Sequence, residues 1–377
     1  MKVQSISTES GERYLLLDDD YSVIEPVRRY LKYLDICGRS PHTLRTYAYH
    51  LKLYYDYLAL QGIDALEVAS APGARPADTL SGFLFWLQYP ESAQGIVHLS
   101  AEVSVRSDNS VNQILNAVLG FYQYLAANRE IRELEVYQTQ RRSRQYKPFL
   151  YELMHHKAEL SRSMFKKRLP KPELKYITRK QYETLLTCAG TRRDRLLLAL
   201  LFEGGLRLSE ALGMHIEDLC RLEDGVFRIV PREDNRNGAR VKRNAAGIIK
   251  VPDYVVDLAV KYLVSDLMEY DTDYVFINYT GKFAGEPMSL SGAEKLFDRL
   301  SRRAGFEVHP HMLRHGFATE KLEAGWELVD IQVYLRHKNI VSTQIYAQYT
   351  DELKKEKMRA FLQQKEEDMR RIAHAIR

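Results

Sequence analysis

The sequence is poor in cysteine. The chain has 377 residues but only three cysteines, Cys37, Cys188 and Cys220, which stand far apart. This spacing excludes a disulfide framework and closely paired zinc-binding cysteines, and it indicates a reducing compartment. The sequence also lacks an apolar run of roughly 20 residues, which a membrane helix needs, and it opens without a signal peptide. We therefore expect a cytoplasmic protein with no membrane partner.

The charge is not dominated by one sign. Lysine and arginine number 55 and aspartate and glutamate 50, so the net charge is only +5. A mild positive excess permits a polyanionic partner without requiring one. Hydrophobic residues make up 45% of the chain, which is enough for real cores. The length favours two or three domains.

Helical periodicity dominates the sequence. Residues 1–20 predict an N-terminal arm, and 21–130 predict a compact helical domain. Residues 131–175 form a basic linker, and 176–377 predict a second, mostly helical domain with one small antiparallel sheet. The expected fold class is therefore mainly α with a small antiparallel β-sheet.

Local signals fix several boundaries. Ser40 is a good N-cap, Pro41 follows at the first helical position, and Gly62 ends that helix. Thr178 predicts the N-cap of a later helix, and Asp108 or Ser110 that of another.

The second domain carries strand signals as well as helical ones. Segments 225–234 and 245–255 alternate in the manner of strands, with the basic segment 235–244 as a hairpin tip between them. Residues 273–278 predict a further short strand.

The linker is strongly basic. Between Thr139 and Lys171 it has ten lysines and arginines against two glutamates. One interpretation is a solvated linker, and the other is a strap across a phosphate backbone. The residues of the strap would be Arg141, Arg142, Arg144, Lys147, Lys166, Lys167, Arg168 and Lys171.

An arginine follows a break in an apolar helix. Gly204 and Gly205 interrupt the helix, and Arg207 stands among apolar neighbours just before the next one. An arginine placed in this way needs an anionic partner. It either pairs with Glu210 or presents a guanidinium fork to a phosphate.

A second cluster combines two histidines with an arginine. His311 and Arg314 are three residues apart and share a helix face, and His315 follows at once. The HExxH zinc pattern is absent, because no carboxylate lies between the histidines, and we expect no metal. Core histidines are an alternative, but a phosphate site accounts better for an arginine beside proton-carrying groups.

A third cluster holds a candidate nucleophile. His337 lies nine residues before Tyr346. Arginines and histidines nearby would stabilise an ionised phenol, which favours Tyr346 as a nucleophile, with Tyr349 as its competitor.

Together these clusters resemble the signature boxes of the tyrosine recombinases, or phage integrase family. "GGLRLSEAL" resembles the first-arginine box, "HMLRHGFAT" the His-x-x-Arg-His box, and "YLRHKNIVSTQIYAQY" the last histidine with its tyrosine. Arg336 stands where the family has glycine. The helices "SPHTLRTYAYHLKLYYDYL" and "SVNQILNAVLGFYQYL" resemble the family's core-binding domain, where Thr43 and Arg45 become candidate DNA contacts.

The resemblance implies a helical core-binding domain followed by a catalytic domain, and it implies a role for each site residue. Tyr346 would attack a DNA phosphodiester to form a 3′-phosphotyrosyl link, while Arg207 and Arg314 hold the phosphate oxygens. The other roles fall to His311 in proton movement, His337 on a phosphate oxygen, and Lys242 as general acid with Lys250 as the alternative. Glu210 and His315 would support them. No cofactor, metal or ATP is implied.

The resemblance also implies partners. We expect double-stranded DNA, a monomer in the free state and a homo-tetramer on the DNA synapse, in a protein associated with the nucleoid. The long strap and hairpin favour the integration or excision of a mobile element. A type IB topoisomerase-like enzyme, a chromosome-dimer resolvase and a DNA-binding protein without catalysis are the alternatives.

Overall fold

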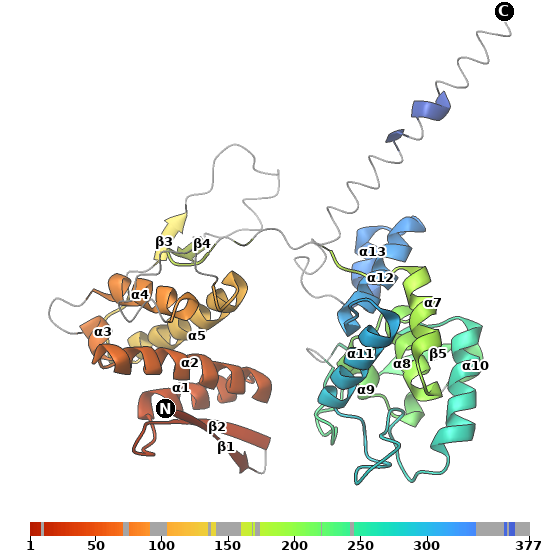
Figure 1. Cartoon of the computed structure of the whole chain (residues 1–377), viewed down its shortest axis with the longest axis horizontal. Coiled ribbons are helices and arrows are strands. Elements are labelled where there is room, and N and C mark those ends of the chain that lie inside the picture. Colours follow the sequence, from red (N-terminus) through yellow and green to blue (C-terminus); the bar gives the residue numbers. More distant parts are fainter. Residues whose placement is uncertain are drawn as a thin grey trace, which may run out of the picture. The chain divides into compact units, whose positions relative to one another are not determined.

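The computed structural model divides into two compact units, Met1–Lys171 and Pro172–Arg377, shown in Figure 1. It describes residues 1–8, 11–70, 75–90, 104–134, 137–140, 160–167, 169, 174–219, 221–241, 245–336, 358–359 and 362–365. None of the helices within these ranges combines the length and hydropathy of a membrane span.

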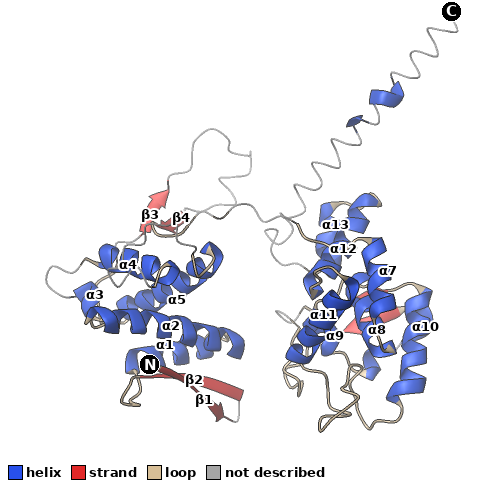
Figure 2. Ribbon diagram, viewed as in Figure 1, coloured by secondary structure: helices blue, strands red, loops and turns tan. Residues whose placement is uncertain are grey.

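The first unit opens with a β-hairpin where the sequence predicted an arm. Strand β1 (Lys2–Thr8) pairs antiparallel with β2 (Gly11–Leu17), in a register that runs from the pair Lys2 and Leu17 to the pair Thr8 and Gly11. Figure 2 shows the hairpin beside the first two helices. Leu16 of β2 is fully buried, so the hairpin contributes to the core of this unit.

A helical bundle makes up the rest of this unit. Its helices are α1 (Glu25–Ile36), α2 (Pro41–Gln61), α3 (Glu67–Ser70), α4 (Pro76–Gln88) and α5 (Asp108–Ala127). Two short antiparallel strands follow, β3 (Tyr137–Gln140) and β4 (Leu160–Ser163). The core is rich in tyrosine: Tyr54 and Tyr122 are buried with their hydroxyls 2.6 Å apart, and the Tyr122 hydroxyl donates to Ala65 O at 3.0 Å.

The start and end signals of α2 are confirmed. The Ser40 hydroxyl accepts a hydrogen bond from the Thr43 N–H at 3.2 Å, and Pro41 occupies the first turn. Gly62 ends the helix with φ +64°, a left-handed conformation that glycine adopts at little cost. In the second unit, Thr178 is likewise confirmed as the N-cap of the helix Arg179–Cys188.

The predicted cap of α5 was wrong. The N-cap is Ser107, whose hydroxyl accepts from the Ser110 N–H at 3.3 Å. Asp108 stands one position inside the helix, and its carboxylate accepts a hydrogen bond from the Gln88 side chain at 2.9 Å.

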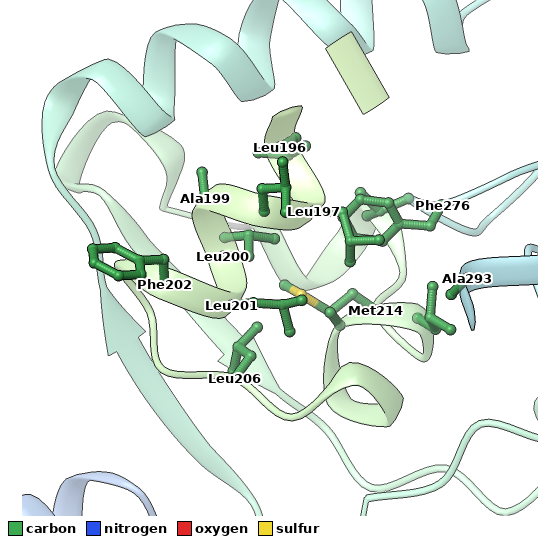
Figure 3. Close-up of a cluster of buried hydrophobic side chains, with 14 of the residues drawn as sticks. Leu196, Leu197, Ala199, Leu200, Leu201, Phe202, Leu206, Met214, Phe276 and Ala293 are labelled. Atoms are coloured by element: carbon green, nitrogen blue, oxygen red, sulfur yellow. The ribbon is translucent and has the colours of Figure 1, made fainter. Parts of the chain in front are cut away.

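Helices also dominate the second unit. They are α7 (Arg179–Cys188), α8 (Arg192–Phe202), α9 (Leu208–Leu212), α10 (Asp253–Tyr262), α11 (Leu290–Ala304), α12 (Pro310–Glu323) and α13 (Leu328–Tyr334). Every residue from Leu196 to Phe202 of α8 is buried, so this helix runs through the core (Figure 3). Side chains on every face of α8 have partners, and its direction is therefore firmly set.

A two-stranded sheet completes the second unit. Strand β5 (Val226–Ile229) pairs antiparallel with β6 (Gly247–Lys250). The strand predicted at 273–278 is wrong: Tyr274 and Ile277 form only isolated bridges. Residues 274–277 are all buried and belong to the core of this unit. The mainly helical fold class with small antiparallel sheets is confirmed.

Candidate active site

The link between α8 and α9 packs tightly against α12 and the C-terminal end of α13. Gly205 has φ +61°, and a Cβ atom there would lie 2.8 Å from both Leu335 Cδ2 and Phe317 Cδ1. Only glycine therefore lets α12, which carries Phe317, and the residue after α13 approach this link. The tight packing holds Arg207 beside α12.

Arg207 is the N-cap of α9 and bonds to Glu210 of the same helix. Its Nη1 donates to Glu210 Oε1 at 2.5 Å, and its backbone N–H donates to Glu210 Oε2 at 2.9 Å. Arg207 remains 17% exposed, so part of its side chain is accessible to solvent. The ion pair with Glu210 and the binding of a phosphate are therefore compatible, since a guanidinium group can bind a carboxylate and a phosphate at the same time.

Arg314 reaches the same place from α12. It is only 3% exposed and donates from Nη1 to Gly205 O at 2.6 Å and from Nη2 to Leu335 O at 2.5 Å. Its Nη1 lies 3.6 Å from Glu210 Oε2. Two backbone carbonyls therefore fix the direction of this guanidinium.

Glu210 is the anion at the centre of the cluster. Its side chain is fully buried, and burial alone would raise its pKa. The charges of three neighbouring arginines, that of Arg336 first, outweigh burial and lower the pKa of Glu210 below its ordinary value. One carboxylate thus faces three guanidinium groups, and the cluster keeps an excess of positive charge for an anion.

The two histidines of α12 differ in their surroundings. His311 is exposed, one turn before Arg314 on the same helix. His315 is half-buried, and burial, followed by the charges of His311 and Arg314, lowers its pKa to about 4. His315 is therefore neutral at pH 7 and offers one donor and one acceptor.

Several predicted residues lie outside the described part of the chain. They are Lys242, His337, Tyr346 and Tyr349 of the catalytic set and Arg141, Arg142, Arg144, Lys147, Arg168 and Lys171 of the linker. The alternative general acid, Lys250, is exposed on β6, and its backbone N–H donates to the Tyr334 hydroxyl at 3.3 Å.

The remaining candidate DNA contacts lie in the first unit. Lys166 is exposed. Lys167 is engaged within its own unit, because its ammonium lies 3.0 Å from the Asp108 carboxylate and its backbone N–H donates to Asn112 at 2.9 Å.

On α2, Thr43 belongs to the helix cap and Arg45 is exposed beside Tyr49, with its guanidinium carbon 5.9 Å from the ring centroid. Both residues therefore lie in the first turns of this helix.

Arg336 belongs to the site, and sequence reasoning treated it only as a departure from a motif. Its Nη2 donates to Glu210 Oε2 at 2.9 Å. The signal was present, since an arginine stood where a glycine was expected just before His337. Among the described residues, no group of three or more histidine, cysteine or acidic side chains could hold a metal ion.

Residues 175–352 match the Phage integrase family. Transposase A from transposon Tn554 of Staphylococcus aureus is 33% identical over 370 residues, which cover 97% of this chain and 99% of that protein. Tyrosine recombinase XerA of Thermococcus kodakarensis is 26% identical over 87% of this chain and 92% of its own. The chain therefore belongs to the phage integrase family of tyrosine recombinases and is a site-specific recombinase.

Solved structures share the fold. A lambda integrase fragment, residues 75–356 bound as a dimer to a COC′ core site, gives a TM-score of 0.55 at 15% identity over 86% of this chain and 94% of that one. The Tn1549 transposon integrase in complex with circular intermediate DNA gives 0.54 at 15% identity over 85% and 94%. The catalytic-domain fold implied by the signature boxes is confirmed.

Proposed function

We propose that this recombinase cleaves and rejoins double-stranded DNA through a 3′-phosphotyrosyl intermediate and thereby integrates and excises a mobile element. The observation that carries the proposal is the convergence of Arg207 and Arg314, from different helices, on the buried Glu210 carboxylate. The similarity to a transposon-encoded transposase supports the mobile element.

The reaction transfers a phosphoryl group from the 5′-oxygen of the DNA to the oxygen of a tyrosine. The phenol oxygen of Tyr346 attacks the scissile phosphorus, the bond to the 5′-oxygen breaks, and Lys242 gives that oxygen a proton. His311 assists removal of the phenol proton, and His337 donates a hydrogen bond to a phosphate oxygen. Because the phosphotyrosine conserves the phosphodiester bond energy, rejoining is the same reaction in reverse and needs no ATP.

The arginines stabilise the transition state. Arg207 and Arg314 bind the non-bridging oxygens, whose negative charge grows as the fifth bond forms. Glu210 positions both guanidinium groups, and neutral His315 supports the helix face from which His311 and Arg314 project. Fixed backbone acceptors around Arg314 mean that little reorganisation is required when the phosphate arrives.

DNA is held by both units. The basic strap, from Arg141 to Lys171, follows the phosphate backbone, and Thr43 and Arg45 of α2 meet a neighbouring phosphate. Lys167 anchors the strap to α5 through Asp108. The free protein is a monomer associated with the nucleoid in the cytoplasm. A homo-tetramer forms when two DNA sites are aligned, because strand exchange cuts four strands.

Trapping of the covalent intermediate tests this function. On DNA nicked beside the scissile phosphate, the wild-type chain should form a covalent adduct that denaturing gels resolve. Tyr346→Phe should form none while it binds DNA with unchanged affinity, because the hydroxyl is the nucleophile and contributes little to binding. Tyr349→Phe is the matched control and should form the adduct normally.

Three outcomes would contradict parts of the proposal. An adduct from Tyr346→Phe that Tyr349→Phe lacks would move the nucleophile to Tyr349. An intact chain that binds DNA and never forms an adduct would indicate a DNA-binding protein without catalysis. Relaxation of supercoiled DNA that requires no second specific site would indicate a topoisomerase.

A further inference from the structure

The residue that follows the C-cap of α13 has an unusual conformation. Arg336 has φ +56°, and among the described non-glycine residues only Tyr21 and Arg129 share a positive φ. Helices commonly end in this left-handed conformation, but glycine normally supplies it because a Cβ atom is strained there. An arginine held in this strained conformation indicates that its side chain makes contacts that offset the strain.

The Arg336 side chain runs into the protein interior. Only 9% of it is exposed. Its Nη2 donates to Glu210 Oε2 at 2.9 Å, its Nη1 donates to Tyr334 O at 3.0 Å, and its Nε is buried without a hydrogen-bond partner. At Gly247 of β6 a Cβ atom would lie 2.9 Å from Arg336 Cδ, so the Arg336 side chain packs directly against this glycine.

This placement couples Arg336 to the two catalytic arginines. Glu210 Oε2 accepts from Arg336 and from the Arg207 N–H, and it lies 3.6 Å from Arg314 Nη1. The preceding carbonyl, Leu335 O, accepts from Arg314 Nη2. The turn at 335–336 therefore contacts both the glutamate and one arginine, and His337 is the next residue in the chain.

We propose that Arg336 is a positioning residue for strand cleavage, which fixes the turn before His337 to the Glu210 carboxylate. It acts through Glu210 and its own backbone, since its two terminal nitrogens donate to the Glu210 carboxylate and to Tyr334 O. The contact holds the turn at 335–336 beside Arg207 and Arg314. The inference rests on the proposed function of that site.

The chain offers a matched control for the backbone. Arg129 has φ +58° and is exposed at the end of α5, in the other unit. Arg129→Gly and Arg336→Gly relieve the same strain, but only Arg336→Gly removes the contact with Glu210. We expect Arg336→Gly to lower single-turnover cleavage on nicked DNA about ten- to hundredfold, the effect of a small misplacement of reacting groups. DNA affinity should not change, and Arg129→Gly should cleave normally.

A substrate with an uncharged phosphate group distinguishes a residue that positions the site from one that contacts the phosphate. In a methylphosphonate, a methyl group replaces one non-bridging oxygen, so the charge that a contacting arginine neutralises is gone. The defect of Arg314→Ala should shrink on this substrate, whereas the defect of Arg336→Gly should persist. A defect of Arg336→Gly that shrinks in the same way would make Arg336 a phosphate contact and overturn the proposal, as would a wild-type rate on ordinary DNA.

A second variant decides the matter if Arg336→Gly does not fold. Arg336→Lys keeps the charge but cannot bond Glu210 and Tyr334 O together from one planar group. A reduced rate on both substrates supports the proposal, and a wild-type rate overturns it. Failure of the proposed function is separate, because the wild-type chain would then form no adduct or Tyr346→Phe would still form one.

Discussion

The two units bury different kinds of polar group. In the first unit the buried polar side chains among the described residues are neutral, Gln88 and Asn112, and tyrosine hydroxyls bond to one another in the core. In the second unit five charged residues are buried: Arg193, Asp194, Glu210, Asp218 and Arg314. Since burying a charge is costly unless it is paired, each of these needs a structural or functional reason.

A second contrast lies within the second unit itself. Each side-chain nitrogen of Arg193 has an acceptor, because its Nε and Nη2 donate to Asp194 and its Nη1 donates to Ile277 O at 2.6 Å. The Glu210 cluster has three arginines for one carboxylate. A balanced pair stabilises a fold, whereas a surplus of guanidinium groups creates a place for an anion. Excess charge, more than burial, distinguishes the proposed catalytic site from the Arg193 pair.

The largest expected effect is on the rate of strand cleavage, and it distinguishes the Glu210 cluster from the Arg193–Asp194 pair. Arg314→Ala should reduce single-turnover cleavage by about two to three orders of magnitude, the loss typical for one transition-state charge stabiliser. It should also lower the free energy of unfolding by about 3–5 kcal/mol, because Arg314 is buried beside Glu210. Arg207→Ala should cost a similar factor in cleavage but less stability, since Arg207 is partly exposed.

The control is Arg193→Ala, assayed under conditions in which it stays folded. It should lose stability while its cleavage rate per folded molecule stays within about threefold of wild type, a difference of under 1 kcal/mol in the barrier. A folded Arg314→Ala protein that cleaves normally would reduce Arg314 to the structural role of Arg193.

Low pH should reduce the free energy of unfolding of the second unit, because His315 is more basic in the unfolded chain than in the folded one. Its pKa is about 4 in the folded chain, against an ordinary value of 6.5, so the unfolded chain takes up the proton first. The stabilisation is complete above pH 6.5 and is lost as the pH falls towards 4, by at most about 3 kcal/mol. Each unit holds one of the two tryptophans, so fluorescence of Trp326 in a Trp86→Phe background reports this unit alone.

His315→Asn should flatten this part of the pH profile, and substitution of the exposed His309 should not. A profile that is the same in His315→Asn and in the intact chain would assign the acid sensitivity to carboxylates such as Glu210.

The sequence was most informative where function depends on short spacing. The ion pair of Arg207 with Glu210, one of the two alternatives for this arginine, joins residues only three positions apart, and the structure contains it. His311 and Arg314, also three apart, both lie on α12. The bond between Arg336 and Glu210 spans 126 positions, and no local rule predicts it. The segment predicted as a strand at 273–278 forms only isolated bridges to His215 and Pro287, and Pro287 has no N–H with which to extend a ladder.

A smaller effect distinguishes two adjacent lysines of the first unit. Lys166 is exposed, whereas the Lys167 ammonium lies 3.0 Å from Asp108. Lys166→Gln should reduce the slope of log affinity against log salt by about 0.9, the loss of one phosphate contact. Lys167→Gln should leave the slope unchanged and lower the stability of its unit. Equal slopes for Lys166→Gln and the intact chain would make this stretch a solvated linker.

The smallest effect concerns the neutral core of the first unit. Tyr54→Phe removes the hydroxyl 2.6 Å from Tyr122, but Tyr122 still donates to Ala65 O. No buried donor loses its acceptor, so the expected cost is about 1 kcal/mol. Tyr122→Phe leaves both the Tyr54 hydroxyl and the Ala65 carbonyl without this partner and should cost about 1–3 kcal/mol. Urea unfolding followed by Trp86 fluorescence in a Trp326→Phe background measures both, and neither variant should change the rate of strand cleavage. If Tyr54→Phe costs as much as Tyr122→Phe, the two hydroxyls act as one cooperative network, and the first unit depends on its polar core as strongly as the second.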